Sequence, residues 1–207
     1  MADQTHKPRP ARGKRSSIAD IRRRELARAA LRTIEKHGVK GATVQRVSEE
    51  AGISQGLVHY HYKTKADLLE AAVKLTNRLI TEEVLLRLRQ ARTPHERVLS
   101  VLEANFSPEV FSKETAQAWA SCSGEAAFNP RFARVMNLIE RRLISNLAHD
   151  LCKIMPADQA RQLARILTIM SDGIWLQAAR WDGAFDREAA VKPVWDLLAL
   201  ASVQLHR

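Results

Sequence analysis

The stretch TVQRVSEEAGISQGLVHYHY, residues 43–62, has the spacing of a helix-turn-helix. Thr43 is a good N-cap for one short helix, and Ser54 is a good N-cap for a second one. Two short helices that cross at a steep angle need a small residue at the crossing and a glycine in the turn, and Ala51 and Gly52 fit these places. The shared core of the two helices would be formed by Val47, Ile53, Val58 and Tyr62.

The opposite face of the second short helix is polar and aromatic, as suits a recognition helix that lies in the major groove of DNA. The candidate residues on this face are Gln55, Gly56, His59, Tyr60 and Lys63. Thr43 and Lys65 would reach phosphates, helped by the free amides of the helix N-termini. A three-helix bundle without DNA contacts is the alternative interpretation of the same pattern.

Residues 20–70 resemble the DNA-binding domain of the tetracycline-repressor (TetR) family. The resemblance includes the Ser-x-Gly entry to the recognition helix and the Lys-x-Lys that follows it. It implies DNA contacts from a set of matching positions: Thr43, Ser54, Gln55, Gly56, Leu57, His59, Tyr60 and Lys65. The sequence departs from the family pattern at Ser48, His59 and Tyr62, where alanine, tyrosine and phenylalanine are usual. Because of His59 and Gln55, the operator sequence cannot be predicted from the family pattern.

The positive charge of the chain is concentrated at its beginning. The net charge is +10, and residues 1–66 contain 15 Lys/Arg against 6 Asp/Glu. This division is typical of a polyanion-binding module joined to a nearly neutral body, although a basic tail that serves only solubility would give it too. Residues 1–18 are expected to be a disordered basic arm, and contact of Arg9, Arg12 or Arg15 with the minor groove stays open.

The remaining chain is expected to be helical. The first helix of the head would run from Ile21 to a stop at Gly38, and Thr64 would begin a long helix with a capping box. Later helices would begin at Pro94, Pro108, Pro130 and Pro156, and the last would span roughly 187–205. The sequence therefore predicts an all-α fold of nine helices. Its parts would be the arm (1–18), a DNA-binding domain (19–66) and a ligand-binding and dimerisation domain (67–207).

Several functional classes are not favoured by the sequence. No apolar run approaches the roughly 20 residues that span a bilayer. Cys122 and Cys152 cannot form a disulfide framework, and the histidines form no metal-ligand cluster, so neither a metal nor a cofactor is expected. The chain contains no nucleophile elbow, phosphate loop or HExxH motif. These observations favour a cytoplasmic regulator over an enzyme, and the near-neutral second domain argues against an architectural DNA binder.

Three stretches of the second domain are similar to the choline-responsive repressors of betaine-synthesis genes. They are EANF (103–106), NLIERRLISNL (137–147) and ARQLARILTIMSDGIWLQAA (160–179). The resemblance implies a small-molecule inducer that is a quaternary ammonium compound, which aromatic faces and carboxylates hold well. The candidate ligand residues are Phe106, Trp119, Asp172 and Trp175. The alternatives are that these aromatics are core, that Asp172 caps a helix or pairs with an arginine, and that the ligand is a different small apolar or aromatic molecule.

The resemblance also implies a homodimer formed by the last two helices, in which ligand changes the separation or tilt of the two DNA-binding heads and releases a palindromic operator. Two stripes at helical spacing are the candidate interface. They consist of Ala164, Leu167, Ser171, Ile174 and Ala178 on one helix and Val194 and Leu198 on the next. Either stripe could instead face the internal core.

Overall fold

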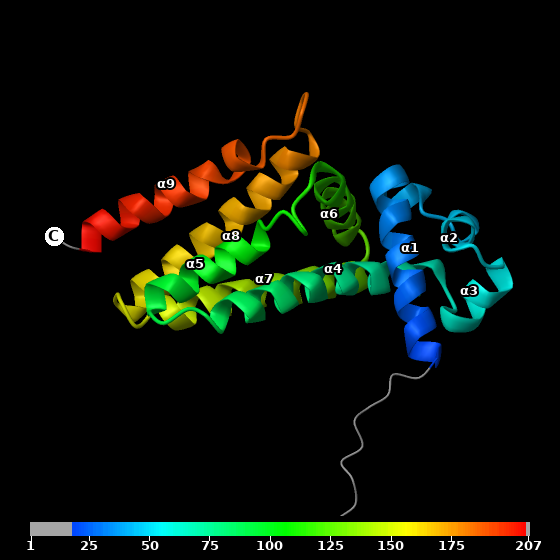
Figure 1. Cartoon of the computed structure of the whole chain (residues 1–207), viewed down its shortest axis with the longest axis horizontal. Coiled ribbons are helices and arrows are strands. Elements are labelled where there is room, and N and C mark those ends of the chain that lie inside the picture. Colours follow the sequence, from blue (N-terminus) through cyan, green and yellow to red (C-terminus); the bar gives the residue numbers. More distant parts are fainter. Residues whose placement is uncertain (1–17, 206–207) are drawn as a thin grey trace, which may run out of the picture.

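The structure is a computed structural model that describes residues 18–205, and these residues form nine α-helices without a strand (Figure 1). The helices are α1 (Ile18–Gly41), α2 (Val44–Ala51), α3 (Gln55–His61), α4 (Lys65–Leu88), α5 (Pro94–Asn105), α6 (Lys113–Ala126), α7 (Pro130–Leu151), α8 (Ala157–Ala179) and α9 (Arg187–Leu205). Helices α1 to α3 form a head at one end, and α4 to α9 form an elongated body (Figure 1). The prediction of an all-α, nine-helix fold is confirmed.

Local capping signals fix the helices of the head. The Thr43 hydroxyl accepts a hydrogen bond from Arg46 N, and the Ser54 hydroxyl accepts one from Leu57 N, each at 3.3 Å. Helix α2 ends at Gly52, whose φ of 66° lies in the left-handed region that a Cβ would strain. Helix α1 breaks at Gly38, where φ is 67°, and one further turn follows to Gly41. The helix-turn-helix therefore forms where the sequence places it.

The core of the head continues into the body. Val47 and Val58 are buried, and Ile53 and Tyr62 pack against them, as predicted. The same cluster includes residues of three body helices: Leu68, Leu69, Ala72 and Val73 of α4, Ala118 and Cys122 of α6, and Phe132 of α7. The expected domain boundary after residue 66 falls at the start of α4, inside this cluster. The head and these three body helices therefore share one continuous core.

The beginning of α6 corrects one prediction. Pro108 does not open a helix but lies in a turn, in which the amides of Val110 and Phe111 both donate to the Ser107 carbonyl oxygen. Ser112 caps α6 instead, because its hydroxyl accepts a hydrogen bond from Thr115 N at 3.2 Å. A proline suits the first turn of a helix, but it suits turns equally well, so the residue alone did not decide between them.

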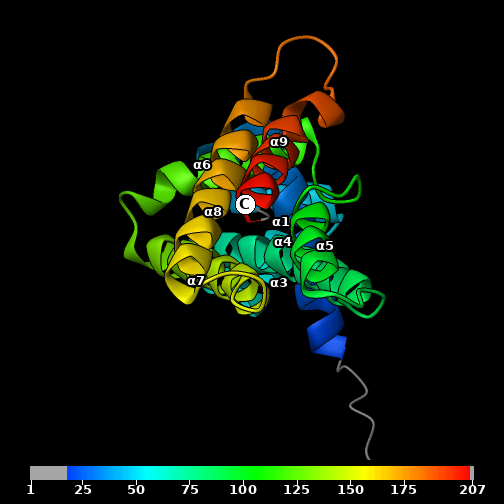
Figure 2. The same cartoon turned by 90° about the vertical axis from the view of Figure 1, so that its left-hand side faces the viewer.

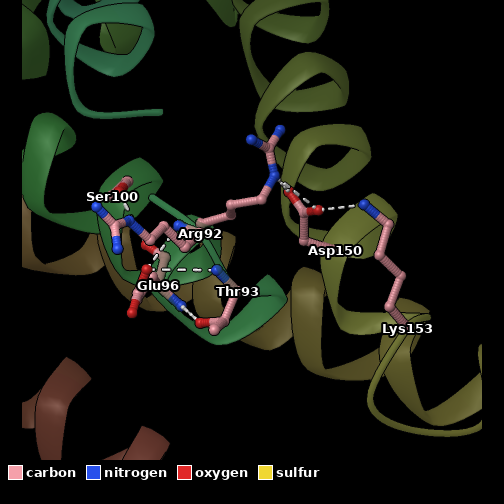
Figure 3. A network of polar contacts seen from close by, with 7 residues as sticks. Arg92, Thr93, Glu96, Ser100, Asp150 and Lys153 are labelled. Atoms are coloured by element: carbon pink, nitrogen blue, oxygen red, sulfur yellow. Dashed lines mark hydrogen bonds and ion pairs between the residues drawn. The ribbon is translucent and has the colours of Figure 1, made fainter. Parts of the chain in front are cut away.

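The core of the body is built from all six of its helices, α4 to α9, which Figure 2 shows from the end away from the head. An ion cluster around a buried carboxylate joins α5 to α7 near that end. Asp150 is 3% exposed, and it accepts hydrogen bonds from Arg97 Nε at 3.0 Å and Lys153 Nζ at 2.6 Å. Figure 3 shows Lys153 reaching Asp150. Burial opposes ionisation of Asp150, but the two cations outweigh it and hold its pKa below the ordinary value.

None of the helices in the described residues is long and apolar enough to cross a membrane. The expected basic arm, with Arg9, Arg12 and Arg15, lies outside the described residues except for its last residue, Ile18, which begins α1.

Candidate DNA-binding head and ligand cavity

Helix α3 turns one side chain inward and most of the others outward. Val58 is 1% exposed and holds α3 against the head, whereas Gln55, Gly56, Leu57 and His59 lie on the surface. Tyr60 is 71% exposed, and its ring packs edge-on against His61. An exposed aromatic and polar face on a short helix that is anchored by one buried residue can enter a DNA groove without disturbing the core.

The remaining candidate DNA contacts surround α3. Thr43 and Ser54 are exposed at the N-termini of α2 and α3, where their hydroxyls cap the helices. Lys63 is exposed after α3, and Lys65 donates from Nζ to the Lys40 carbonyl oxygen at 3.0 Å. The nine candidate residues thus gather on α3 and at the helix ends beside it, and the first residue of α4 is hydrogen-bonded to the end of α1.

A cavity of about 190 Å³ lies inside the body, lined by residues of α4, α5, α6, α7 and α8. It is smaller than the roughly 300–1,000 Å³ of pockets that take drug-sized ligands, so it fits a small molecule. Trp119, Asp172 and Trp175, three of the four predicted ligand residues, line it. The cavity therefore has room for a small molecule, and its wall contains two indoles and a carboxylate.

The two indoles and the carboxylate are close together. The ring centroids of Trp119 on α6 and Trp175 on α8 are 6.0 Å apart, and Asp172 lies nearly one turn before Trp175. The Asp172 carboxylate forms no hydrogen bond or ion pair with the part of the chain that the structure describes, so it neither caps a helix nor pairs with an arginine there. Burial, and then the negative charge of Glu140, raise the pKa of Asp172 to about 6.

The cavity also contains residues that the sequence analysis missed. The second carboxylate of the wall is Glu140 on α7, and α4 contributes Asn77, Ile80 and Thr81. The sequence contained a partial indication that Glu140 is a cavity residue, because Glu140 flanks the apolar stripe of α7 within the stretch NLIERRLISNL. Two carboxylates and two indole rings around one small space form an environment that stabilises a compact cation.

Phe106 does not line the cavity, which corrects its predicted role. It is 1% exposed, and its ring packs against Phe111 at 5.2 Å, while Phe111 packs against Trp175 at 4.8 Å. Phe185 covers Phe111 from the connection between α8 and α9, at 5.4 Å. Phe106 therefore belongs to the aromatic cluster behind Trp175 and helps to fix the orientation of that indole.

The predicted dimer stripes also require correction. In the single chain all seven side chains are buried, with exposed fractions from 0% at Ala164 to 8% at Leu198. The six apolar members, Ala164, Leu167, Ile174, Ala178, Val194 and Leu198, belong to the body core, and Ser171 is buried beside them. A side chain that its own protomer encloses has no surface left for a second copy. The stripes have helical spacing, but they face inward.

The two cysteines have different surroundings. Burial, and then the charge of Glu125, raise the pKa of Cys122 to about 12, so its thiol stays protonated. Cys152 is exposed just after α7. Within residues 18–205, no group of three or more His, Cys, Asp or Glu side chains is arranged to hold a metal ion.

Two family models match this chain. The model of bacterial regulatory proteins of the tetR family matches residues 26–72, and the model "BetI-type transcriptional repressor, C-terminal" matches residues 94–201. The first match covers the helix-turn-helix, and the second covers most of the body, including the cavity helices α5 to α8.

Relatives and solved structures agree with these matches. The chain is 33% identical to the HTH-type transcriptional regulator BetI of Brucella abortus, over 87% of the chain and 91% of the relative. It is 34% identical to BetI of Paraburkholderia xenovorans, over 88% and 94%. A putative transcriptional regulator from Saccharomonospora viridis, solved in complex with choline, is 20% identical and has a TM-score of 0.75 over 86% of this chain and 96% of that one. A TetR regulator from Haloarcula marismortui is 20% identical, with a TM-score of 0.76 over 88% and 97%.

A helix-turn-helix head on a helical body defines a DNA-binding transcriptional regulator, a class of protein that is not enzymatic. The chain belongs to the TetR family, and its C-terminal domain is of the BetI repressor type.

Proposed function

We propose that this repressor is released from its operator by a small quaternary ammonium compound, with choline as the first candidate. The observation that carries the proposal is the cavity wall, in which Trp119, Trp175, Asp172 and Glu140 surround a space of about 190 Å³. A quaternary ammonium group cannot donate hydrogen bonds, so aromatic faces and carboxylates are the groups that attract it. The choline complex of the S. viridis regulator, which has the same fold, supports this choice.

The positions of α4 and α7 support a route from the cavity to the head. Both helices line the cavity and both begin beside the head (Figure 1). Arg131, in the first turn of α7, donates to Asp67 Oδ1 at 2.8 Å and to Glu70 Oε2 at 2.7 Å, both in the first turns of α4. Asp67 is also the second member of the capping box that starts α4, because its Oδ2 accepts from Thr64 N at 2.9 Å. A ligand that moves α7 relative to α4 would act on the segment that follows the recognition helix.

The proposal includes a homodimer, with an interface different from the buried stripes. Helix α8 presents a second apolar face, with Ile166, Ile169 (69% exposed) and Leu176, and α9 presents Leu200 (67% exposed). These side chains lie on the surface of the protomer, and apolar surface of this kind is stabilised by contact with a second copy. Such a dimer would place its two DNA-binding heads on the two half-sites of a palindromic operator in the cytoplasm.

The proposed function is tested with the full-length protein and the palindromic DNA near its own gene. We expect choline to quench or shift the tryptophan fluorescence saturably, because Trp119 and Trp175 line the cavity. Over the same concentration range, choline should lower the affinity for the palindrome about 5- to 150-fold, the range of ordinary allosteric coupling. Random DNA of equal length at the same salt concentration is the control. A flat fluorescence response together with unchanged operator affinity would contradict the choline proposal.

A second test concerns the contact between α4 and α7. We expect Arg131→Met to leave choline affinity within about twofold and to reduce the effect of choline on operator affinity to less than about threefold, because the variant no longer ties α7 to the start of α4. Titrations of ligand by fluorescence and of operator by anisotropy measure the two quantities separately. Arg134→Met, an exposed arginine of the same helix, is the matched control. An unchanged choline effect in Arg131→Met would show that the signal takes another route.

A further inference from the structure

Helix α7 brings opposite charges to two edges of the ligand cavity. Met136, Ile139, Leu143 and Asn146 line the cavity from the middle of one helix face, at the spacing that a single face requires. Glu140 and Arg142 line the cavity as well. Because successive residues of a helix are about 100° apart, side chains two positions apart point about 160° away from each other. Glu140 and Arg142 must therefore flank the face on opposite sides.

The edge with Glu140 adjoins α8. Glu140 and Asp172 both line the cavity, and in agreement with this proximity the charge of Glu140 contributes to the raised pKa of Asp172. Glu140 also lines a groove on the outer surface, together with Arg165 and Ile169 of α8. The α8 side of the cavity therefore contains two carboxylates, those of Glu140 and Asp172, and the indole of Trp175.

The edge with Arg142 adjoins α4. Arg131 lies about three turns before Arg142, on the same side of α7, and it contacts Asp67 and Glu70 of α4. Helices α4 and α7 run in the same direction from the head (Figure 1), so about three turns beyond Glu70 the facing region of α4 is near Thr81. Thr81 lines the cavity, as does Asn77 one turn earlier. The polar α4 residues that line the cavity together with Arg142 are therefore the neutral Asn77 and Thr81, in contrast to the carboxylates that Arg131 contacts.

The guanidinium of Arg142 has no hydrogen bond or ion pair with any residue between 18 and 201. A guanidinium contains only donors, so a ligand group that replaces water on it must be an acceptor. The cavity is thus dipolar, with carboxylates and indoles on the α8 side and an available cationic donor on the α4 side. A molecule with a cationic head and an oxygen at its other end matches both sides.

We propose that Arg142 is a specificity-determining residue that binds the oxygen of the ligand, so that the site takes quaternary ammonium compounds bearing a hydroxyl, carbonyl or carboxylate oxygen rather than purely alkyl ammonium ions. This inference rests on the proposed function, because it assigns the second end of the same ligand. Asp172, Glu140 and the two indoles hold the ammonium group, and the donors of Arg142 hold the oxygen. Arg142 is exposed at the edge of the cavity, so water competes with this contact and its effect is moderate.

The test compares choline with propyltrimethylammonium, in which a methyl group replaces the hydroxyl at nearly equal size. We expect the wild-type full-length protein to bind choline about 5- to 10-fold more tightly than the propyl compound, as measured by tryptophan fluorescence or calorimetry. In Arg142→Met the two affinities should become equal, because choline loses its hydrogen bond to the guanidinium while both cations lose the same repulsion from its charge. Arg142→Lys should keep part of the preference, and Arg134→Met should keep all of it. Glycine betaine, which has a carboxylate, should lose more affinity than choline in Arg142→Met.

The outcomes separate this inference from the proposed function. If the wild-type protein binds both cations equally, or if Arg142→Met weakens both by the same factor, the role of Arg142 is overturned while the ammonium site stands. If neither cation binds to the wild-type protein, the proposed function fails and this inference fails with it. A preference that disappears only in the Arg142 variants supports the assignment.

Discussion

Asp172→Asn is expected to lower choline affinity about 30- to 100-fold at pH 7.5, the largest loss that we expect for a single cavity residue. The substitution keeps the shape of the side chain but removes the negative charge that faces the ammonium group. Trp119 and Trp175 would remain in place, so fluorescence titration still reports residual binding. Asp158→Asn, which changes an exposed carboxylate in the first turn of the same helix, is the matched control and should bind normally. Unchanged choline affinity in Asp172→Asn would remove Asp172 from the proposed site.

In the wild-type protein, choline affinity should depend on pH, because protonation removes the same negative charge of Asp172. A cation binds best to ionised Asp172, and the pKa of this carboxyl is raised to about 6. Choline affinity should therefore be constant at pH 7.5–8 and fall as the pH drops through about 6, by up to about tenfold per pH unit. In Asp172→Asn this fall should disappear, which distinguishes titration of Asp172 from titration of the histidines.

In the absence of ligand, the Asp172→Asn variant should have a larger free energy of unfolding than the wild-type protein. The folded pKa of Asp172 lies above the unfolded one, so the folded state binds a proton more tightly and ionisation destabilises the fold. The stability of the wild type should thus decrease as the pH rises from about 4 through about 6, and Asn at this position avoids the loss. After allowing for partial solvent screening, we expect a gain of about 1–2 kcal/mol at pH 8 in urea unfolding and almost none at pH 4. Equal stabilities at pH 8 would contradict this assignment of the carboxyl group.

Tyr60→Ala is expected to weaken operator binding by about 1–3 kcal/mol per half-site while leaving the unfolding midpoint almost unchanged. Tyr60 is 71% exposed on α3, so its loss creates no cavity, whereas its ring is the largest side chain on the proposed groove-facing surface. Anisotropy with the palindrome and with random DNA, at one salt concentration, separates specific from non-specific affinity. Tyr60→Phe is the control, and it tells whether the ring or the hydroxyl contacts the DNA. Full operator affinity in Tyr60→Ala would mean that α3 does not present this face to a groove.

The helix-turn-helix could be predicted because its signals are local. Thr43, Ser54 and Thr64 cap the helices that follow them through hydrogen bonds to residues three positions away. Gly52 adopts the left-handed conformation at the end of α2, which its own lack of a Cβ permits. Interactions of such short range are encoded in neighbouring residues, so the sequence was sufficient to place α2, α3 and the start of α4.

Local sequence signals gave a wrong prediction where the same residue type favours two different local structures. Pro108 is equally suitable for a helix start and for a turn, and the Ser112 cap and the packing of Phe111 against Phe106 and Trp175 favour the turn. The stripes of α8 and α9 are a related case. Their spacing identifies an apolar helix face, but it does not say whether the partner of that face belongs to the same chain.

By itself the sequence determined the all-α class, most of the helix ends and the exposed face of α3, because capping, periodicity and turn chemistry act within a few residues. The tertiary structure alone decided which distant residues meet. It brought Trp119, Glu140, Asp172 and Trp175 from three helices to one cavity, placed Phe106 behind that cavity, and enclosed the α8 stripe in the protomer. These outcomes depend on how helices pack against one another, and the packing is set by the shapes of all the buried side chains together.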